Sequence, residues 1–294
     1  MIDFLKYRWL TTLISIAIIG SFFATYVYRV QIGQDPLKLS VDFTGGTQAL
    51  YQFEKSVSTE KVKEALSTAG WPNAVLRSFA EGKEVLVRVK AFASDSTGLA
   101  ARMKDTIIKA FPDNKVTILG NESVGQTIGS DLRWRSLLAI LLALLVMLIY
   151  IVVRFRSIGF ALGAVVALFH DTIAILAVFM FSGLEVSVNV VMAILAILGY
   201  SINDTIVIFS QIRKNMAKMK HASLKEIVNV SINQMLRRTL LTSLSTGLAA
   251  TSLLVIGGEA LRSLSIALLV GIIFGTYSSI YIASPAMMLF TKKQ

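Results

Sequence analysis

Residues 186–209 read VSVNVVMAILAILGYSINDTIVIF, an almost continuous apolar run of 24 residues. About 20 predominantly apolar residues are enough for a helix to cross a bilayer. The run also contains one carboxylate, Asp204, in its second half. A charged residue at membrane depth is costly, and such residues usually serve a function. The stretch therefore predicts a transmembrane helix with a candidate functional residue inside it.

Five further runs qualify as membrane spans by the same criterion. They are residues 9–28, 135–153, 158–180, 239–257 and 264–284. The first is too long for the apolar part of a signal peptide, and no small-residue cleavage site follows it, so an uncleaved anchor is expected. The whole chain is 54% apolar and only 16% charged, whereas soluble domains are about 25% charged. The expected fold class is a polytopic α-helical membrane protein with six transmembrane helices.

The net charge of +11 predicts the orientation of these helices. Six crossings put both termini on one side, and the loops and tails of that side hold 13 basic and two acidic residues. The positive-inside rule places that side, with both termini, in the cytoplasm. Residues 30–132 carry 12 basic and 12 acidic residues and are expected outside it. Because the positive charge is spread over four short loops and tails, nucleic-acid binding is not expected.

The loop between the first two spans is long enough to fold as a small domain. Its pattern predicts helices over 58–69 and 95–110, with Ser58 as the N-cap of the first and Gly70 just past its end. Strands are expected at 40–53, with a kink at Gly45-Gly46, and at 74–79, 84–90 and 115–119. The order β-α-β-β-α-β is that of a ferredoxin-like α+β unit. The expected domains are an N-terminal tail and first helix (1–29), an extracytoplasmic α+β domain (30–132) and helices 2–6 (133–294).

Sequence motifs for enzymatic chemistry are missing from the chain. It has no cysteine, no P-loop, no nucleophile elbow and only two histidines, His170 and His221. A metal site at His170-Asp171 is disfavoured, because no further ligand has suitable spacing. We therefore expect a protein that is not an enzyme and that has neither a metal nor an organic cofactor.

Three charged residues inside the spans are the candidate site: Asp171, Asp204 and Arg238. Helical spacing places Tyr200 and Ser201 on the same helix face as Asp204. On another predicted helix, a stripe of small and hydroxylic residues begins at Arg238. The residues expected to form the supporting polar face are Tyr200, Ser201, Asn203, Thr242, Ser245 and His170. Gly271, Gly275 and Ser279 form a small-residue stripe suited to helix packing.

These residues suggest a proton relay, because a carboxylate out of water prefers to be neutral and a nearby arginine favours its charged form. Asp204 would then alternate between a neutral state and a state paired with Arg238. A static ion pair remains the alternative, and Arg238 could instead anchor its helix at the interface. The basic segment 210–238 is expected to be a solvated loop that determines topology, with anionic lipid or a cytoplasmic partner as the alternative.

Several stretches resemble the SecF members of the SecD/SecF family, in the resistance-nodulation-division superfamily. They are GYSINDTIVIF (199–209), VDFTGGT (41–47), ESVGQTIGSDL (122–132), HD (170–171), SINQMLRRTLLTS (231–243) and GGEALRSLSIALLVGIIFGTYSSIYIASP (257–285). Two segments depart from the usual family pattern and are more basic here: Phe209–Lys214 and Met235–Arg238.

The resemblance implies a subunit of the bacterial inner (plasma) membrane that pairs with SecD and docks on the SecYEG channel. It implies use of the proton-motive force to promote translocation and release of secreted proteins, with Asp204 and Arg238 linked to proton conduction and protons as the coupling ion. YajC, the translocating preprotein and anionic lipid are further candidate partners. Two alternatives stay open: a self-sufficient small-molecule exporter of the same superfamily, and a non-transporting scaffold of the translocon.

Overall fold

The computed structural model describes residues 2–90 and 96–291. The chain forms two compact units. One comprises Met1–Lys38 and Leu137–Gln294, and the other comprises Leu39–Ser136. The first is helical, and the second contains the only sheet found among the described residues.

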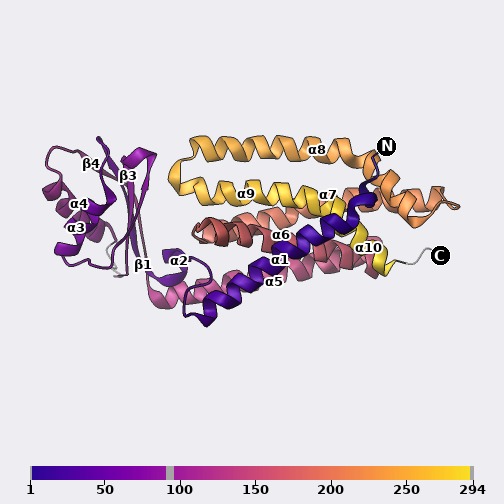
Figure 1. Ribbon diagram of the computed structural model, residues 1–294, viewed down its shortest axis with the longest axis horizontal. Helices are drawn as coiled ribbons and strands as arrows, with labels where there is room; N and C mark the ends of the chain where they lie inside the picture. The colour runs from indigo at the N-terminus through magenta and orange to yellow at the C-terminus, as the bar shows by residue number, and fades with distance from the viewer. Residues whose placement is uncertain (1, 91–95, 292–294) are drawn as a thin grey trace. The chain divides into compact units, whose positions relative to one another are not determined.

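Six helices in the described part of the chain are long and apolar enough to cross a membrane, as the sequence predicted. The first span joins η1 (Phe4–Tyr7) to α1 (Arg8–Gln31), and the last joins α9 (Gly258–Ser278), η3 (Ser279–Ala283) and α10 (Ser284–Phe290). Between them come α5 (Gln126–Phe155), α6 (Ile158–Ser182), α7 (Val188–Lys218) and α8 (Leu224–Ile256). In Figure 1 these helices run along one another, with both chain ends at the same end of the unit.

The centre of the helical unit is formed by α6 and α7, whose apolar faces are largely buried. They pack on the last span, which also lies against α8. The helices α5 and α8 bury little of their surface within this chain. Because α8 lies along α9 (Figure 1), it still contributes one face to the interior of the unit.

The basic segment 210–238 differs from the solvated loop predicted for it. Helix α7 continues to Lys218 and α8 begins at Leu224, so only a short turn remains. The Ser223 side chain accepts a hydrogen bond from the backbone N–H of Glu226 and caps α8. Buried side chains such as Ile212 and Ile227 explain the difference, because they give the basic segment an apolar face on which its two helical ends can pack.

The last span contains one turn of π-helix, η3, between α9 and α10. Pro285 begins the next helical turn and has no N–H for the backbone ladder. Its ring also crowds the carbonyl four residues earlier, that of Tyr281. Single π-turns inside α-helices arise where this ladder is disturbed, and they are frequent at functional sites.

The second unit has a four-stranded antiparallel sheet in the order β2-β3-β1-β4. Its elements are β1 (Gly46–Phe53), α3 (Thr59–Thr68), β2 (Val75–Phe79), η2 (Ala80–Gly82), β3 (Glu84–Val89), α4 (Ser96–Ala110) and β4 (Val116–Val124). The predicted β-α-β-β-α-β order is confirmed, and this strand order is that of two interleaved split β-α-β units. The predicted start of the second helix at residue 95 lies outside the described residues.

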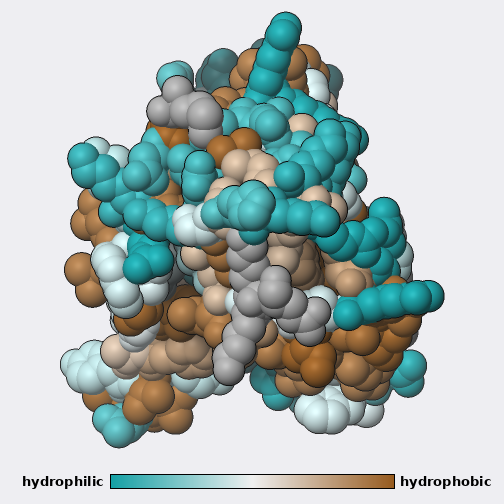
Figure 2. Space-filling model, turned by 90° about the vertical axis from the view of Figure 1, so that its right-hand side faces the viewer, coloured by the Kyte–Doolittle hydropathy of each residue, from teal (hydrophilic) through white to brown (hydrophobic). Residues whose placement is uncertain are grey.

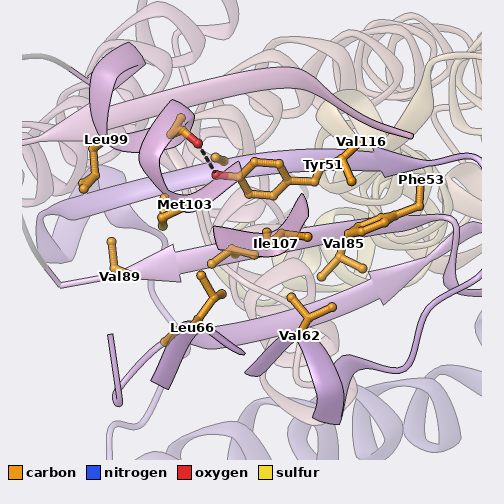
Figure 3. Close-up of a cluster of buried hydrophobic side chains, with 14 residues drawn as sticks. Tyr51, Phe53, Val62, Leu66, Val85, Val89, Leu99, Met103, Ile107 and Val116 are labelled. Atoms are coloured by element: carbon orange, nitrogen blue, oxygen red, sulfur yellow. Dashed lines mark hydrogen bonds between the residues drawn. The ribbon is translucent and has the colours of Figure 1, made fainter. Parts of the chain in front are cut away.

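The core of this unit lies between the sheet and its two helices (Figure 3). Tyr51 points from β1 into this core, and its hydroxyl donates a hydrogen bond to the carbonyl oxygen of Ala100 at 2.9 Å. Burial raises the pKa of the Tyr51 phenol above its ordinary value. The polar end of this large side chain is thus satisfied inside an otherwise apolar core.

The segment 40–53 is not the single strand that was predicted. Residues Val41–Thr44 form a short helix, α2, and the strand begins only at Gly46. The backbone turns at Gly45 (φ 73°) and Gly46 (φ 122°), a region that side chains disfavour. A Cβ atom on Gly46 would lie 2.6 Å from the carbonyl oxygen of Val89. The glycine pair therefore separates helix from strand and allows β1 to approach β3.

Candidate functional site

The buried polar groups of the helical unit form two networks, and α7 contributes to both. Ser201 of α7 belongs to a network around Asp171, whereas Asp204 faces groups of α8. Both carboxylates are almost fully buried, with 0% and 4% of their surface exposed, respectively. The two carboxylates differ in how many hydrogen-bond donors surround them.

The carboxylate of Asp171 has hydrogen-bond partners on both oxygens. Its Oδ2 accepts hydrogen bonds from Ser201 Oγ at 2.6 Å and from Ser278 Oγ at 2.8 Å. Its Oδ1 lies 3.2 Å from Nδ1 of His170, which donates when that nitrogen carries the proton. Asp171 thereby joins α6 to α7 and to the C-terminal end of α9.

The network extends through His170 to the first span. The His170 ring lies 5.9 Å from the ring of Phe274 and 6.0 Å from that of Tyr277, and its Nε2 has no hydrogen-bond partner among the described residues. The Tyr277 hydroxyl donates to the backbone oxygen of Thr11 at 2.7 Å and lies 3.1 Å from Ser15 Oγ. Side chains or backbone groups of four spans therefore meet around Asp171.

Asp204 has a much poorer set of partners. Its Oδ2 is buried and accepts no hydrogen bond from any described residue. The groups of α8 that act on its carboxylate are the Ser243 hydroxyl and the charge of Arg238. No ion pair joins Asp204 to Arg238, both of which the structure describes. The carboxylate is thus buried and lies near the positive charge of Arg238. One of its oxygens has no hydrogen-bond partner among the described residues.

A chain of hydroxyl groups lies beside Asp204. Ser243 Oγ lies 2.6 Å from Thr276 Oγ1 of α9, and the Tyr200 hydroxyl donates to Ser243 Oγ at 3.4 Å. The sequence predicted Tyr200 in this region but missed Ser243 and Thr276. The sequence signal that points to Ser243 is its spacing from Thr239. The two residues are four positions apart and therefore share one face of α8, and both are buried.

The polar stripe predicted on α8 faces away from the other helices of this chain. Arg238 and Ser245 are exposed and Thr242 is partly buried, whereas Thr239, Ser243 and Ala250 form the buried face. Thr242 Oγ1 donates to the backbone oxygen of Arg238 at 3.1 Å, so it bonds within its own helix. Asn203 of α7 is also exposed. The buried face is thus shifted by one residue from the stripe that begins at Arg238.

The small residues of the last span lie at close helix contacts. A Cβ atom on Gly271 would lie 2.5 Å from Ile197 Cγ1, and one on Gly275 would lie 3.0 Å from Ser201 Cβ. Ser279 is buried in the π-turn, and its hydroxyl donates to the backbone oxygen of Thr276 at 2.9 Å. These glycines allow α9 to approach α7 at the level of Ser201.

An amide network joins α7 and α8 further along the two helices and was not anticipated from the sequence. Gln234 Oε1 accepts from Gln211 Nε2 at 2.6 Å and from Asn215 Nδ2 at 2.8 Å. Asn215 Nδ2 also donates to Ser231 Oγ at 2.8 Å. Uncharged residues thus connect the two helices within the basic segment 210–238. Among residues 2–90 and 96–291, no group of three or more ligating side chains could hold a metal ion.

Six apolar spans and buried carboxylates inside the helical bundle define a class: multi-spanning membrane proteins with ionisable groups at membrane depth. Comparisons with known proteins identify the family. Residues 103–293 match the model described as protein export membrane protein SecD/SecF, C-terminal, and residues 32–57 match the SecD/SecF GG motif. The chain belongs to the SecD/SecF family, among the SecF subunits of the protein translocase.

Curated relatives support this assignment over most of the chain. The protein translocase subunit SecF of Pseudomonas aeruginosa is 40% identical over 252 residues, which cover 86% of this chain and 81% of the relative. The SecF subunit of Thermodesulfovibrio yellowstonii is 37% identical and covers 99% of this chain and 95% of the relative. These relatives are named as transport subunits, in agreement with the expectation that the chain is not an enzyme.

A solved structure has the same fold. The crystal structure of SecDF, a translocon-associated membrane protein from Thermus thermophilus, matches with a TM-score of 0.85 at 33% identity and covers 98% of this chain. The match covers 38% of the SecDF chain, so the present chain spans well under half of that protein.

Proposed function

We propose that this chain works with a SecD partner and uses the proton-motive force to promote translocation and release of secreted proteins. One observation carries the proposal: the Asp204 carboxylate is buried in a membrane span, and one of its oxygens has no partner among the described residues. Such a group is expensive to keep charged and can bind a proton without first losing a hydrogen bond at that oxygen.

Asp204 and Arg238 together form the coupling site in this proposal. When Asp204 is ionised it attracts the guanidinium of Arg238, and when it is protonated this attraction is lost. Moving one charge across the membrane potential is worth about 2.3 kcal/mol per 100 mV. Proton entry and release at Asp204 would thus bias the contact between α7 and α8, and the outer unit would act as a lever or touch the emerging chain.

The partner is inferred from polar surface that this chain does not cover. Gly199 and Asn203 of α7 and Ser245 and Thr246 of α8 are exposed although they lie in membrane-spanning helices. Polar side chains facing lipid are costly, whereas small and hydroxylic residues favour contact with another helix. A second helical subunit would cover this surface. The match to a longer SecDF chain makes SecD the natural occupant, and SecYEG and YajC would be further neighbours of the assembly.

The orientation and lipid contacts form part of the same proposal. Figure 2 shows hydrophilic side chains gathered at the end of the helical unit that carries both termini, and we assign this end to the cytoplasm of a bacterial inner membrane. At this end the guanidinium carbons of Arg154 and Arg213 lie 5.5 and 5.4 Å from the centre of the Phe155 ring. Two cations on one aromatic ring would suit anionic lipid headgroups.

The decisive test is Asp204→Asn in vesicles that contain the SecYEG channel and the SecD partner. We expect normal assembly and loss of the component of preprotein export that depends on the proton gradient. Glu226→Gln, the same change at an exposed carboxylate in the first turn of α8, is the control and should export normally. Undiminished gradient-dependent export by Asp204→Asn would instead favour a scaffold, and solute export by a homo-oligomer would favour a self-sufficient exporter.

A further inference from the structure

The two buried carboxylates of adjacent spans have opposite environments, and this difference bears on their roles. Asp171 has partners on both oxygens, whereas Asp204 has an oxygen without one among the described residues. A hydrogen bond from a neighbouring donor restrains the position of a buried carboxylate. The hydrogen bonds on both oxygens therefore hold the Asp171 side chain in one position.

The serine donors around Asp171 are themselves buried and closely packed. Ser201 and Ser278 are buried to 1% and 0% exposure. The close approach of Gly275 leaves Ser201 little room, because even a Cβ atom there would lie 3.0 Å from Ser201 Cβ. Ser278 is the last residue of α9, directly before the π-turn η3. The Asp171 carboxylate thus ties α6 to a fixed point on α7 and to a fixed point on the last span.

The fixed point on α7 determines where Asp204 faces. Ser201 and Asp204 are three residues apart, less than one turn of helix, and they point to different neighbours, Asp171 and α8. Successive residues of an α-helix are rotated by about 100° around its axis. A small rotation of α7 would therefore move Asp204 away from Ser243 and Arg238. The hydrogen bond between Ser201 and Asp171 opposes this rotation.

We infer that Asp171 is a positioning residue, which acts through Ser201 to hold Asp204 towards α8, and that it does not carry the translocated proton. The inference rests on the proposed role of Asp204. Asp171, which the sequence predicted to be a relay residue, therefore has a different role from Asp204. The titratable side chain in contact with Asp171 is His170 of its own helix, whose ring lies beside Tyr277 of α9. From α7, Asp171 receives the neutral donor Ser201.

The first test compares Asp171→Asn with Asp171→Leu in the vesicle assay. The Asn Oδ1 atom can still accept from both serines, and its Nδ2 can donate to His170, whereas Leu keeps the size and loses every acceptor. We expect Asn to retain about half or more of the gradient-dependent rate with an unchanged pH profile, and Leu to lose about tenfold. An assembled Asp171→Asn complex that is inactive, or whose pH profile is shifted, would overturn the inference.

A second variant keeps the inference testable even where Asp171→Asn does not assemble. Ser201→Ala leaves the Asp171 carboxylate in place and removes one donor. A positioning role predicts a lower rate with the same pH midpoint. A proton carrier that loses a donor binds its proton more tightly, so a midpoint moved to higher pH would contradict us. Asp204→Asn in the same assay separates the two proposals: if it exports normally the relay fails, whatever the outcome at Asp171.

Discussion

At the scale of single residues, the surroundings of a buried carboxylate matter more than its depth. Asp171 and Asp204 are both almost fully buried in adjacent spans. Two serine donors and a histidine nitrogen surround the first, while the second lies near one cation with an oxygen left without a partner among the described residues. This difference is the basis for the two roles proposed above, a positioning role for Asp171 and a proton-binding role for Asp204.

A substitution at Arg238 can distinguish a specific interaction with Asp204 from simple anchoring of the helix at the interface. Lysine keeps the positive charge of Arg238 but lacks the planar fork that binds a carboxylate through two nitrogens. If Arg238 meets Asp204 during the cycle, Arg238→Lys should lower gradient-dependent export several-fold at equal expression. The adjacent exposed residue offers a matched control, since Arg237→Lys makes the same change one position away and should have little effect. Equal rates for both variants would assign Arg238 to anchoring.

These residues also mark the limit of what helical spacing can predict. Spacing correctly places Ser201 and Asp204 near one another along one helix, and it predicted that they act together. In the structure Ser201 donates instead to Asp171 of another helix. On α8 the buried face runs through Thr239 and Ser243, one residue away from the stripe predicted from Arg238. The spacing of residues shows which of them share a face, but the neighbouring helices decide which face is covered.

At the scale of elements, glycine permits the closest contact between α7 and the last span. A Cβ atom on Gly271 would overlap the Ile197 side chain at 2.5 Å. Gly271→Ala should therefore destabilise the helical unit by about 1–3 kcal/mol, the usual cost of overpacking. This would lower the midpoint of thermal unfolding, measured on the detergent-solubilised chain without its partner.

The control for Gly271→Ala is the same substitution in open space. Gly247 lies within α8, and an added Cβ atom would meet nothing within 4 Å. Because alanine favours a helix over glycine by up to about 1 kcal/mol, Gly247→Ala should be neutral or slightly stabilising. A thermal midpoint for Gly271→Ala equal to that of Gly247→Ala would show that α9 does not approach α7 so closely.

Element types followed from the sequence more reliably than element boundaries. The apolar runs identified all six spans, because a bilayer imposes a minimum length that composition alone reveals. The helical continuation across 210–218 and 224–238 was missed, since its basic residues hide the apolar face on which it packs. The sequence predicts a kink within one strand at Gly45-Gly46, whereas the two positive φ angles there separate the short helix α2 from the strand.

At the scale of the whole molecule, charge and fold point to the same organisation. The α+β unit comprises Leu39–Ser136, and the sequence that surrounds it carries the positive surplus. The short loops and tails on the side of both termini carry this surplus and are expected in the cytoplasm, so the segment between the first two spans is expected on the outer side. The fold match over 98% of the chain shows that the fold recurs in SecDF, although the present chain covers 38% of that protein.

The orientation can be tested directly because the chain contains no cysteine. Lys83, exposed in the turn between β2 and β3, and Lys225, exposed in the first turn of α8, are suited to single replacements by cysteine. A membrane-impermeant maleimide should label Lys83→Cys in intact spheroplasts and Lys225→Cys only after lysis. Both variants replace an exposed lysine, so differences in local reactivity are small and membrane sidedness decides the result. Labelling of Lys225→Cys alone in intact spheroplasts would reverse the assigned topology and, with it, the direction in which Asp204 would release its proton.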